Sequence, residues 1–224
     1  MFLEVIVETL KQAKDASCYG ADRLELVSAI SEGGLTPSLG LIEAVSGAVD
    51  IPVQVMLRPH SDSFVYSEDD IKVLLRDLEL IKSTKAQGVV FGALHPDGSI
   101  NEGLLDKVIE QKGHLSLTFH RAVDESKNYN ESIALLLSKS INTILTSGGK
   151  PTALEGKEIL NDKKSLFAAN QVELLAGKGL NATSVQEIYN LTGISHVHMG
   201  SGVKSGDNID EQKIKRVKSI GNSL

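Results

Sequence analysis

Four titratable residues interrupt or end apolar runs that read as buried strands. Glu4 and Glu25 stand inside FLEVIV and RLELV, while Arg58 and His120 follow VQVML and LSLTF. A desolvated carboxylate is expected to have a partner of opposite charge, and Arg58 is the candidate partner for Glu4 or Glu25. The four residues therefore predict either a catalytic cluster of acid, base and anion clamp or a structural ion pair inside the fold. Arg58 and His120 favour the catalytic interpretation, because each stands at the end of its strand.

Three glycine-rich turns extend this candidate site, together with Arg121 and Asp124 just after His120. The turns cover 146–149, 176–179 and 200–202, and their candidate ligand-binding residues are Ser147, Gly148, Gly177, Lys178, Gly200 and Ser201. Glycine lets backbone amides turn toward an anion, so the turns predict binding of a phosphate or carboxylate, with Lys178 as a point charge. Tight loops without a ligand are the alternative.

His196 and His198 are two residues apart on a predicted strand, so their side chains share one face and could bind a metal. An ordinary half-buried position for both is the favoured alternative, because no carboxylate motif accompanies them.

Short runs rich in Val, Ile and Leu alternate with helical stretches and would bring these residues together. The candidate strands cover 2–7, 23–27, 53–57, 88–91, 115–119, 143–146, 172–176 and 196–199. Eight such units predict an α/β fold, a single-domain (β/α)8 TIM barrel over residues 1–224, with the chemistry at the carboxyl ends of the strands. An open doubly wound sheet is the alternative, but the dinucleotide motif G-x-G-x-x-G is absent.

Local signals place helix starts and one notable loop. Thr36, followed by proline, predicts a helix N-cap, and Ser67 with Asp70 predicts a capping box. The loop 60–66 before that box carries Phe64 and is either a lid over the barrel mouth or an ordinary surface loop.

Composition limits the classes of protein that this chain could be. The 224 residues carry 23 Lys and Arg against 29 Asp and Glu, and 41% are hydrophobic. This balance predicts a globular protein with no nucleic-acid partner. Glu4 interrupts the first apolar run and no 18-residue apolar segment follows, so we expect a cytoplasmic protein with no membrane contact. The one cysteine, Cys18, excludes an intrachain disulfide and is expected to be a buried small residue.

Five segments resemble the CutC family. They are EGGLTPSLG (32–40), IPVQVMLRP (51–59), LTFHRAVD (117–124), ILTSGG (144–149) and GADRLEL (20–26). The resemblance implies a cytosolic (β/α)8 barrel, usually oligomeric, with a role in copper homeostasis. It also maps the polar cluster inside the family's barrel onto Glu4, Glu25, Arg58 and His120.

The resemblance implies copper as a cofactor or cargo, but the chain departs from its relatives at the expected ligands. Some family members carry cysteines after the first-strand glutamate and at the end of the second strand, and thiolates suit Cu(I). Here these places are Val7, Glu8 and Val27. The favoured copper donors are then His120, His196 and His198.

Two functions remain open, so whether the chain is an enzyme is undecided. One is a copper-homeostasis protein that acts on the metal directly or indirectly. The other is a TIM-barrel enzyme, an isomerase, lyase or hydrolase, acting on a small anionic or phosphorylated metabolite. In it, His120 would be the general acid or base, Glu4 or Glu25 its counterpart, and Arg58 the clamp. A small anion or a metal ion is the expected partner, and apolar helix faces together with the resemblance predict a homo-oligomer.

Overall fold

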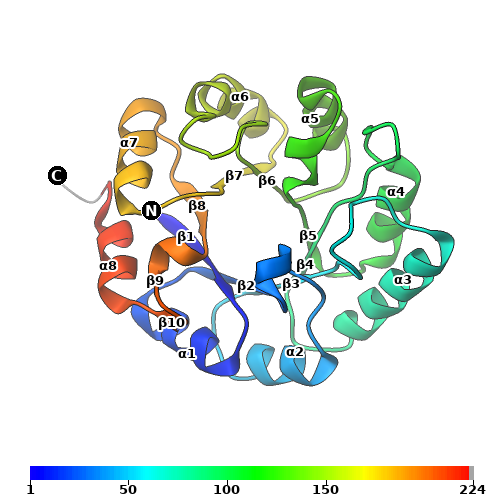
Figure 1. The fold of residues 1–224 in the computed structure, drawn as a ribbon, viewed down its shortest axis with the longest axis horizontal. Helices are drawn as coiled ribbons and strands as arrows, with labels where there is room; N and C mark the ends of the chain where they lie inside the picture. The colour runs from blue at the N-terminus through cyan, green and yellow to red at the C-terminus, as the bar shows by residue number, and fades with distance from the viewer. Residues whose placement is uncertain (222–224) are drawn as a thin grey trace.

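The computed structural model describes residues 1–221, so the last three residues of the predicted domain, 222–224, lie outside the described residues. Eight parallel strands form a closed barrel in the order β1-β2-β3-β4-β5-β6-β7-β8 (Figure 1). They are β1 (Phe2–Val7), β2 (Arg23–Leu26), β3 (Val53–Met56), β4 (Gly88–Phe91), β5 (Ser116–Phe119), β6 (Thr143–Thr146), β7 (Glu173–Gly177) and β8 (His196–Met199). The predicted (β/α)8 TIM barrel is confirmed.

Helices surround the ring of strands (Figure 1). They are α1 (Leu10–Tyr19), α2 (Leu39–Ser46), α3 (Glu68–Lys82), α4 (Glu102–Gln111), α5 (Tyr129–Leu137), α6 (Lys157–Ala169), α7 (Ala182–Thr192) and α8 (Glu211–Ser219). Short 3-10 helices follow three of the strands: η1 (Ile30–Glu32), η2 (Arg121–Glu125) and η3 (Ser201–Val203). A small hairpin of β9 (Lys204–Ser205) and β10 (Asn208–Ile209) precedes α8.

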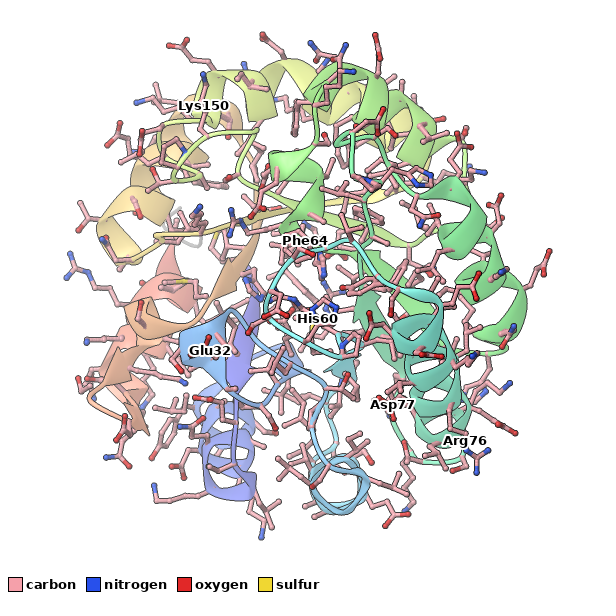
Figure 2. All side chains as sticks on the ribbon, turned by 45° about the vertical axis from the view of Figure 1, so that its right-hand side comes forward. Glu32, His60, Phe64, Arg76, Asp77 and Lys150 are labelled. Carbon is pink, nitrogen blue, oxygen red and sulfur yellow. The ribbon has the colours of Figure 1, made fainter. Side chains whose placement is uncertain are left out.

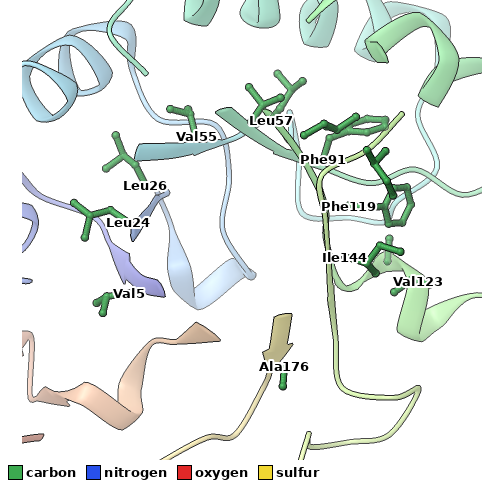
Figure 3. Packing of buried hydrophobic residues seen from close by; sticks show 14 of the residues in the cluster. Val5, Leu24, Leu26, Val55, Leu57, Phe91, Phe119, Val123, Ile144 and Ala176 are labelled. Carbon is green, nitrogen blue, oxygen red and sulfur yellow. The ribbon is translucent and has the colours of Figure 1, made fainter. Parts of the chain in front are cut away.

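The strands present two faces, because successive side chains point to opposite sides. Val5, Leu24, Leu26 and Val55 are buried in the layer that packs against the helices (Figure 3). The intervening residues point into the barrel, where Val27, Met56 and Val90 pack with Ile6 in a separate cluster. Glu4, Arg23 and Glu25 share this inward face, which is how the fold places charge inside the ring.

The capping box that starts α3 is confirmed: the Ser67 hydroxyl accepts from the Asp70 amide and the Asp70 carboxylate accepts from the Ser67 amide. The predicted helix start at Thr36 is wrong, because α2 begins at Leu39 with Ser38 as its N-cap. Thr36 instead bonds to the backbone of Arg58: its hydroxyl accepts from the Arg58 amide at 2.9 Å and donates to the Arg58 carbonyl at 3.1 Å. The segment before α2 therefore fixes the chain at the end of β3.

Cys18 is exposed, so the prediction of a buried cysteine is wrong. The buried face of α1 is formed by Gln12, Ala13 and Ala16. Two residues along a helix is about 200° of rotation, so Cys18 lies on the face opposite Ala16. Within residues 1–221, no helix is long and apolar enough to cross a membrane.

Candidate functional site

A chain of buried ion pairs crosses the barrel interior. The Arg23 guanidinium donates through Nε to Glu4 and through Nη2 to Glu173 Oε1 at 2.6 Å. His198 Nε2 lies 2.8 Å from Glu25 Oε2 and 3.7 Å from Glu4 Oε1. The strand register explains the contacts, since Glu4 is paired with Arg23 on one side and with His198 on the other. Closing the barrel between β1 and β8 thus brings the first and last strands to one cluster.

Burial and charge shift the titration of this cluster in a definite direction. Burial raises the pKa of Glu4, and the charge of Arg23 opposes it only in part. Burial works to lower the pKa of His198, but the Glu25 carboxylate, helped by Glu4, raises it above its usual value. Glu4 and His198 therefore hold their protons more tightly than the same groups would in water.

A second group lies at the carboxyl ends of the strands, around Phe64. The Arg58 Cζ atom is 4.7 Å from the centre of the Phe64 ring, and the His120 ring is 4.8 Å from it. Figure 2 shows Phe64 and His60 toward the middle of the molecule, whereas Arg76 lies on the outer helix α3. Burial, followed by the charge of Arg58, lowers the pKa of His120 to about 3. His120 is thus a neutral imidazole at physiological pH.

Arg58 does not pair with either buried glutamate, so the predicted partnership is wrong. Its Nη1 donates to the carbonyls of Glu32 at 3.2 Å and Gly34 at 3.4 Å, and its Nη2 donates to the Ser61 carbonyl at 3.2 Å. The backbone anchor at Thr36 holds it in the mouth, while Arg23 takes the place beside Glu4.

The turn after β6 is filled by a carboxylate of the protein itself. Asp124 accepts hydrogen bonds from Thr146 Oγ1 at 2.6 Å, from the Ser147 amide at 2.9 Å and from the Gly149 amide at 2.9 Å. The Gly148 amide bonds within the turn to Thr146 Oγ1. These amides do turn toward an anion, as expected of a glycine-rich turn, but the anion is Asp124, so the prediction that Ser147 and Gly148 bind a ligand does not fit this arrangement.

A cavity of about 500 Å³ opens at the carboxyl ends of the strands. Among the predicted site residues it is lined by Glu25, Arg58, His120, Arg121, Lys178, His198, Gly200 and Ser201. Of the other predicted residues, all within the described part of the chain, Glu4 lies deeper, Asp124, Ser147 and Gly148 hold the β6 turn, and Gly177 and His196 are also outside the lining. The structure thus brings the turns after β7 and β8 to the same cavity as Glu25 and His198.

The two histidines of β8 have different neighbours. His198 joins Glu4 and Glu25 in a group whose potential ligand atoms all lie within 4.8 Å of one another. His196 packs instead on the Phe2 ring, with 4.9 Å between ring centres. Of the predicted histidine pair, only His198 stands where carboxylates could complete a metal site.

Sequence reasoning missed two members of the interior cluster, Arg23 and Glu173. The signal for Arg23 was available, because it lies two residues before Glu25 in RLEL and therefore faces the same side of β2. The predicted seventh strand, 172–176, includes Glu173, although β7 runs from Glu173 to Gly177. Glu173 was harder to find, because β7 is not a neighbour of β2 in the ring, so the sequence does not show that it meets Arg23.

A closed barrel with charged residues inside it and a cavity at the carboxyl ends of its strands defines an α/β-barrel protein. The model of the CutC family matches residues 1–203. The chain belongs to the CutC family. It is 36% identical over 217 residues to the family protein CutC of Aliivibrio fischeri (strain MJ11), covering 96% of this chain and 85% of that protein. It is also 35% identical over 210 residues to a copper homeostasis protein cutC homolog of Drosophila melanogaster, covering 92% of this chain and 79% of that protein.

Solved structures agree on the fold. The CutC structure from Streptococcus agalactiae superposes with a TM-score of 0.83 at 25% identity, covering 91% of this chain and 100% of that one. Phosphoribosyl anthranilate isomerase from Thermococcus kodakaraensis superposes with a TM-score of 0.65 at 16% identity, covering 100% of this chain and 99% of that one. The second likeness concerns the barrel alone.

Proposed function

We propose that this chain acts in copper homeostasis, as the name of its Drosophila relative says of that protein, by binding divalent copper at Glu4, Glu25 and His198. The observation that carries this proposal is a pair of buried carboxylate oxygens that receive no hydrogen bond from the described residues. Oε1 of Glu4 and Oε1 of Glu25 are buried near His198 Nε2, and neither has a hydrogen-bond partner in the described part of the chain. A buried carboxylate oxygen without a donor is unfavourable, and a cation bound there would satisfy both.

The formal charge of the cluster supports a divalent ion. The cluster contains three carboxylates, on Glu4, Glu25 and Glu173, and one guanidinium, on Arg23, which pairs with Glu4 and Glu173 while Glu25 lies beside His198. With a neutral His198 the cluster carries two excess negative charges, which one divalent cation would neutralise. Protons taken up by His198 and Glu4 would do the same, so metal and protons compete for the cluster.

The donor types favour Cu(II) over Cu(I). Carboxylate oxygens and an imidazole are hard and borderline donors, and among the divalent first-row metals such sites bind copper most tightly. Cys18, the one thiol of the chain, is exposed on α1, and the group of Glu4, Glu25 and His198 contains no sulfur donor. Three protein donors would leave room for a further ligand on the metal, and two of them, Glu25 and His198, line the cavity.

The test is a titration with Cu(II) against a competing chelator at about pH 7.5 and again near pH 6, because metal binding must displace protons. We expect one equivalent to bind, more weakly at the lower pH. Glu25→Gln and His198→Gln should each weaken binding by about tenfold or more. His196→Gln is the matched control on the same strand and should bind as the unaltered chain does.

Two outcomes contradict the proposal. One is the absence of stoichiometric Cu(II) uptake by the unaltered chain. The other is equal binding by the Glu25→Gln and His196→Gln variants, which would place the ion elsewhere. Circular dichroism of each variant separates loss of the site from loss of the fold.

Catalysis on a small anionic metabolite is the second candidate function. The observation that favours it is that the cations of Arg58 and Lys178 line the same cavity as Glu25 and His198. In that function the Glu25–His198 pair is the acid and base, since His120 stays neutral. Its test is metal-free incubation with a panel of phosphorylated sugars and carboxylic acids followed by NMR. Turnover that Glu25→Gln abolishes would support it, and no consumption of any compound would contradict it.

A further inference from the structure

At the barrel mouth, two hydrogen-bond donors are buried and have no acceptor within residues 1–221. They are Nε of Arg58 and Nε2 of His120. We propose that these two groups form a binding site for the oxyanion of a small carboxylate or phosphate, and that the Phe64 ring occupies the place of this ligand in the structure. The proposal does not depend on metal binding at Glu25 and His198.

The backbone fixes which nitrogen of His120 carries the proton. The Ala122 amide donates to His120 Nδ1 at 3.1 Å, so Nδ1 is the acceptor. A neutral imidazole then carries its hydrogen on Nε2 and can only donate there. His120 is therefore a hydrogen-bond donor toward the cavity, and the sequence-based role of general acid or base does not suit it.

Arg58 is held rigidly enough to act as the charged half of the site. Its terminal nitrogens donate to the carbonyls of Glu32, Gly34 and Ser61, and its backbone is pinned by Thr36. These contacts immobilise the guanidinium without neutralising it, because each acceptor is an uncharged carbonyl. Three of the five N–H groups of the guanidinium are used in these bonds, and Nε, among the described residues, has no acceptor. A positively charged group with an unused N–H is suited to recognise an oxyanion.

Both donors lie deep enough for such a contact to be strong. Arg58 is 7% exposed and His120 is 5% exposed. Water is excluded from both unpaired nitrogens, so each pays a desolvation penalty that a bound oxygen would remove. Glu25 lines the same cavity but approaches His198 and not Arg58, so it does not serve as the missing acceptor.

The Phe64 ring covers the two donors and keeps water away from them. Its ring packs against the Arg58 guanidinium and, in a tilted arrangement, against the His120 ring, while its carbonyl accepts from the Leu94 amide at 2.8 Å. Rotation of the side chain would uncover both donors and leave this backbone bond intact. The bound ligand would thus replace the cation–π contact between Phe64 and Arg58 with a charge-assisted hydrogen bond from Arg58 and a neutral hydrogen bond from His120.

The experiment measures binding of inorganic phosphate and of acetate, at constant ionic strength, by calorimetry and by thermal shift. We expect saturable binding of at least one anion to the unaltered chain. Phe64→Ala should bind it several-fold more tightly, because the ring no longer competes. His120→Phe, which keeps the volume but removes the donor, should bind it about tenfold more weakly or worse. Lys150→Ala removes an exposed cation outside the cavity lining and should change nothing.

The two anions separate the sources of the oxyanion: preference for phosphate indicates a phosphorylated ligand, and preference for acetate a carboxylic acid. The proposal is overturned if neither the unaltered chain nor Phe64→Ala binds either anion saturably. It is equally overturned if His120→Phe binds as well as the unaltered chain. Nitrogen-15 NMR of the His120 ring gives a readout that misfolding cannot imitate: a proton on Nδ1 instead of Nε2 would end the proposal.

Discussion

Replacing Asp124 by asparagine tests how the turn after β6 and the helix η2 are held together. The Asp124 side chain is 3% exposed, receives three hydrogen bonds from the turn and lies 3.2 Å from Arg121 Nε. Asparagine removes the charge and puts an NH2 group against N–H donors. A hydrogen bond to a charged acceptor contributes about 1.5–3 kcal/mol, and a buried donor left unpaired costs about 1–3 kcal/mol. The free energy of unfolding should therefore fall by about 3–5 kcal/mol.

Urea unfolding at neutral pH measures this loss, as a lower midpoint with an unchanged slope. For a chain of this length the melting temperature should fall by roughly 6–20 °C. Asp97→Asn is the matched control, because Asp97 Oδ1 also accepts from a backbone amide and a hydroxyl, both of Ser99, but is exposed. If the two substitutions cost the same stability, the turn does not depend on its internal anion and the reasoning is wrong.

Two further predictions concern His120. Gly92→Ala would place a Cβ 2.4 Å from His120 Nδ1, so the ring must move and the free energy of unfolding should fall by about 1–3 kcal/mol. The control is Gly103→Ala in α4, where the Cβ would lie 3.8 Å from Asn101 Oδ1 and should cost no stability. Urea unfolding compares the two variants. The second prediction is a pH effect. Because the pKa of His120 is about 3 when folded and 6.5 when unfolded, the unfolded chain takes up the proton first as pH falls. Its contribution to stability is lost below about pH 6.5, at about 1.4 kcal/mol per pH unit. The raised pKa values of Glu4 and His198 act in the opposite sense, so the measurement is the difference in slope between the unaltered chain and His120→Phe.

The barrel could be predicted because its signals are local and repeated. The bounds of β1, β4, β6 and β8 agree with the apolar runs residue for residue, and β2, β3 and β5 differ by one residue at an end. The shift at β7 arises because the apolar run begins at Val172 while the ladder with β6 begins at Glu173. A hydrophobic pattern reports burial, but strand bounds are set by hydrogen bonds to a neighbour.

The partners inside the barrel could not be predicted in the same way. Alternation places Glu4 and Glu25 on the inward face, but it does not say which residue of a distant strand stands beside them. Glu4 meets His198 because closure pairs β1 with β8, and this pairing depends on the stagger of the whole ring. Arg58 is on the side of its strand that faces the barrel interior, but it lies too far along the barrel axis to reach Glu4. Arg23 makes the contact with Glu4 instead.

The turn after β6 shows a different limit on what can be predicted from sequence. Its glycines correctly indicate amides that converge on an anion, but the sequence does not show that Asp124, from the preceding loop, fills the place. A turn that binds an internal carboxylate and one that binds a phosphate have the same composition. Only the fold shows whether an acidic residue elsewhere in the chain can reach the turn.

The two proposed sites are not independent if both exist. Glu25, His198, Arg58 and His120 line one cavity of about 500 Å³. A cation at Glu25 and His198 and an oxyanion at Arg58 and His120 would therefore lie close together. Opposite charges attract more strongly there than in water. Each would then raise the affinity of the other by the same factor, because linkage is reciprocal. A metal titration performed without the anion would therefore report the weaker of two affinities, and a copper complex of a small acid would bind more tightly than either component.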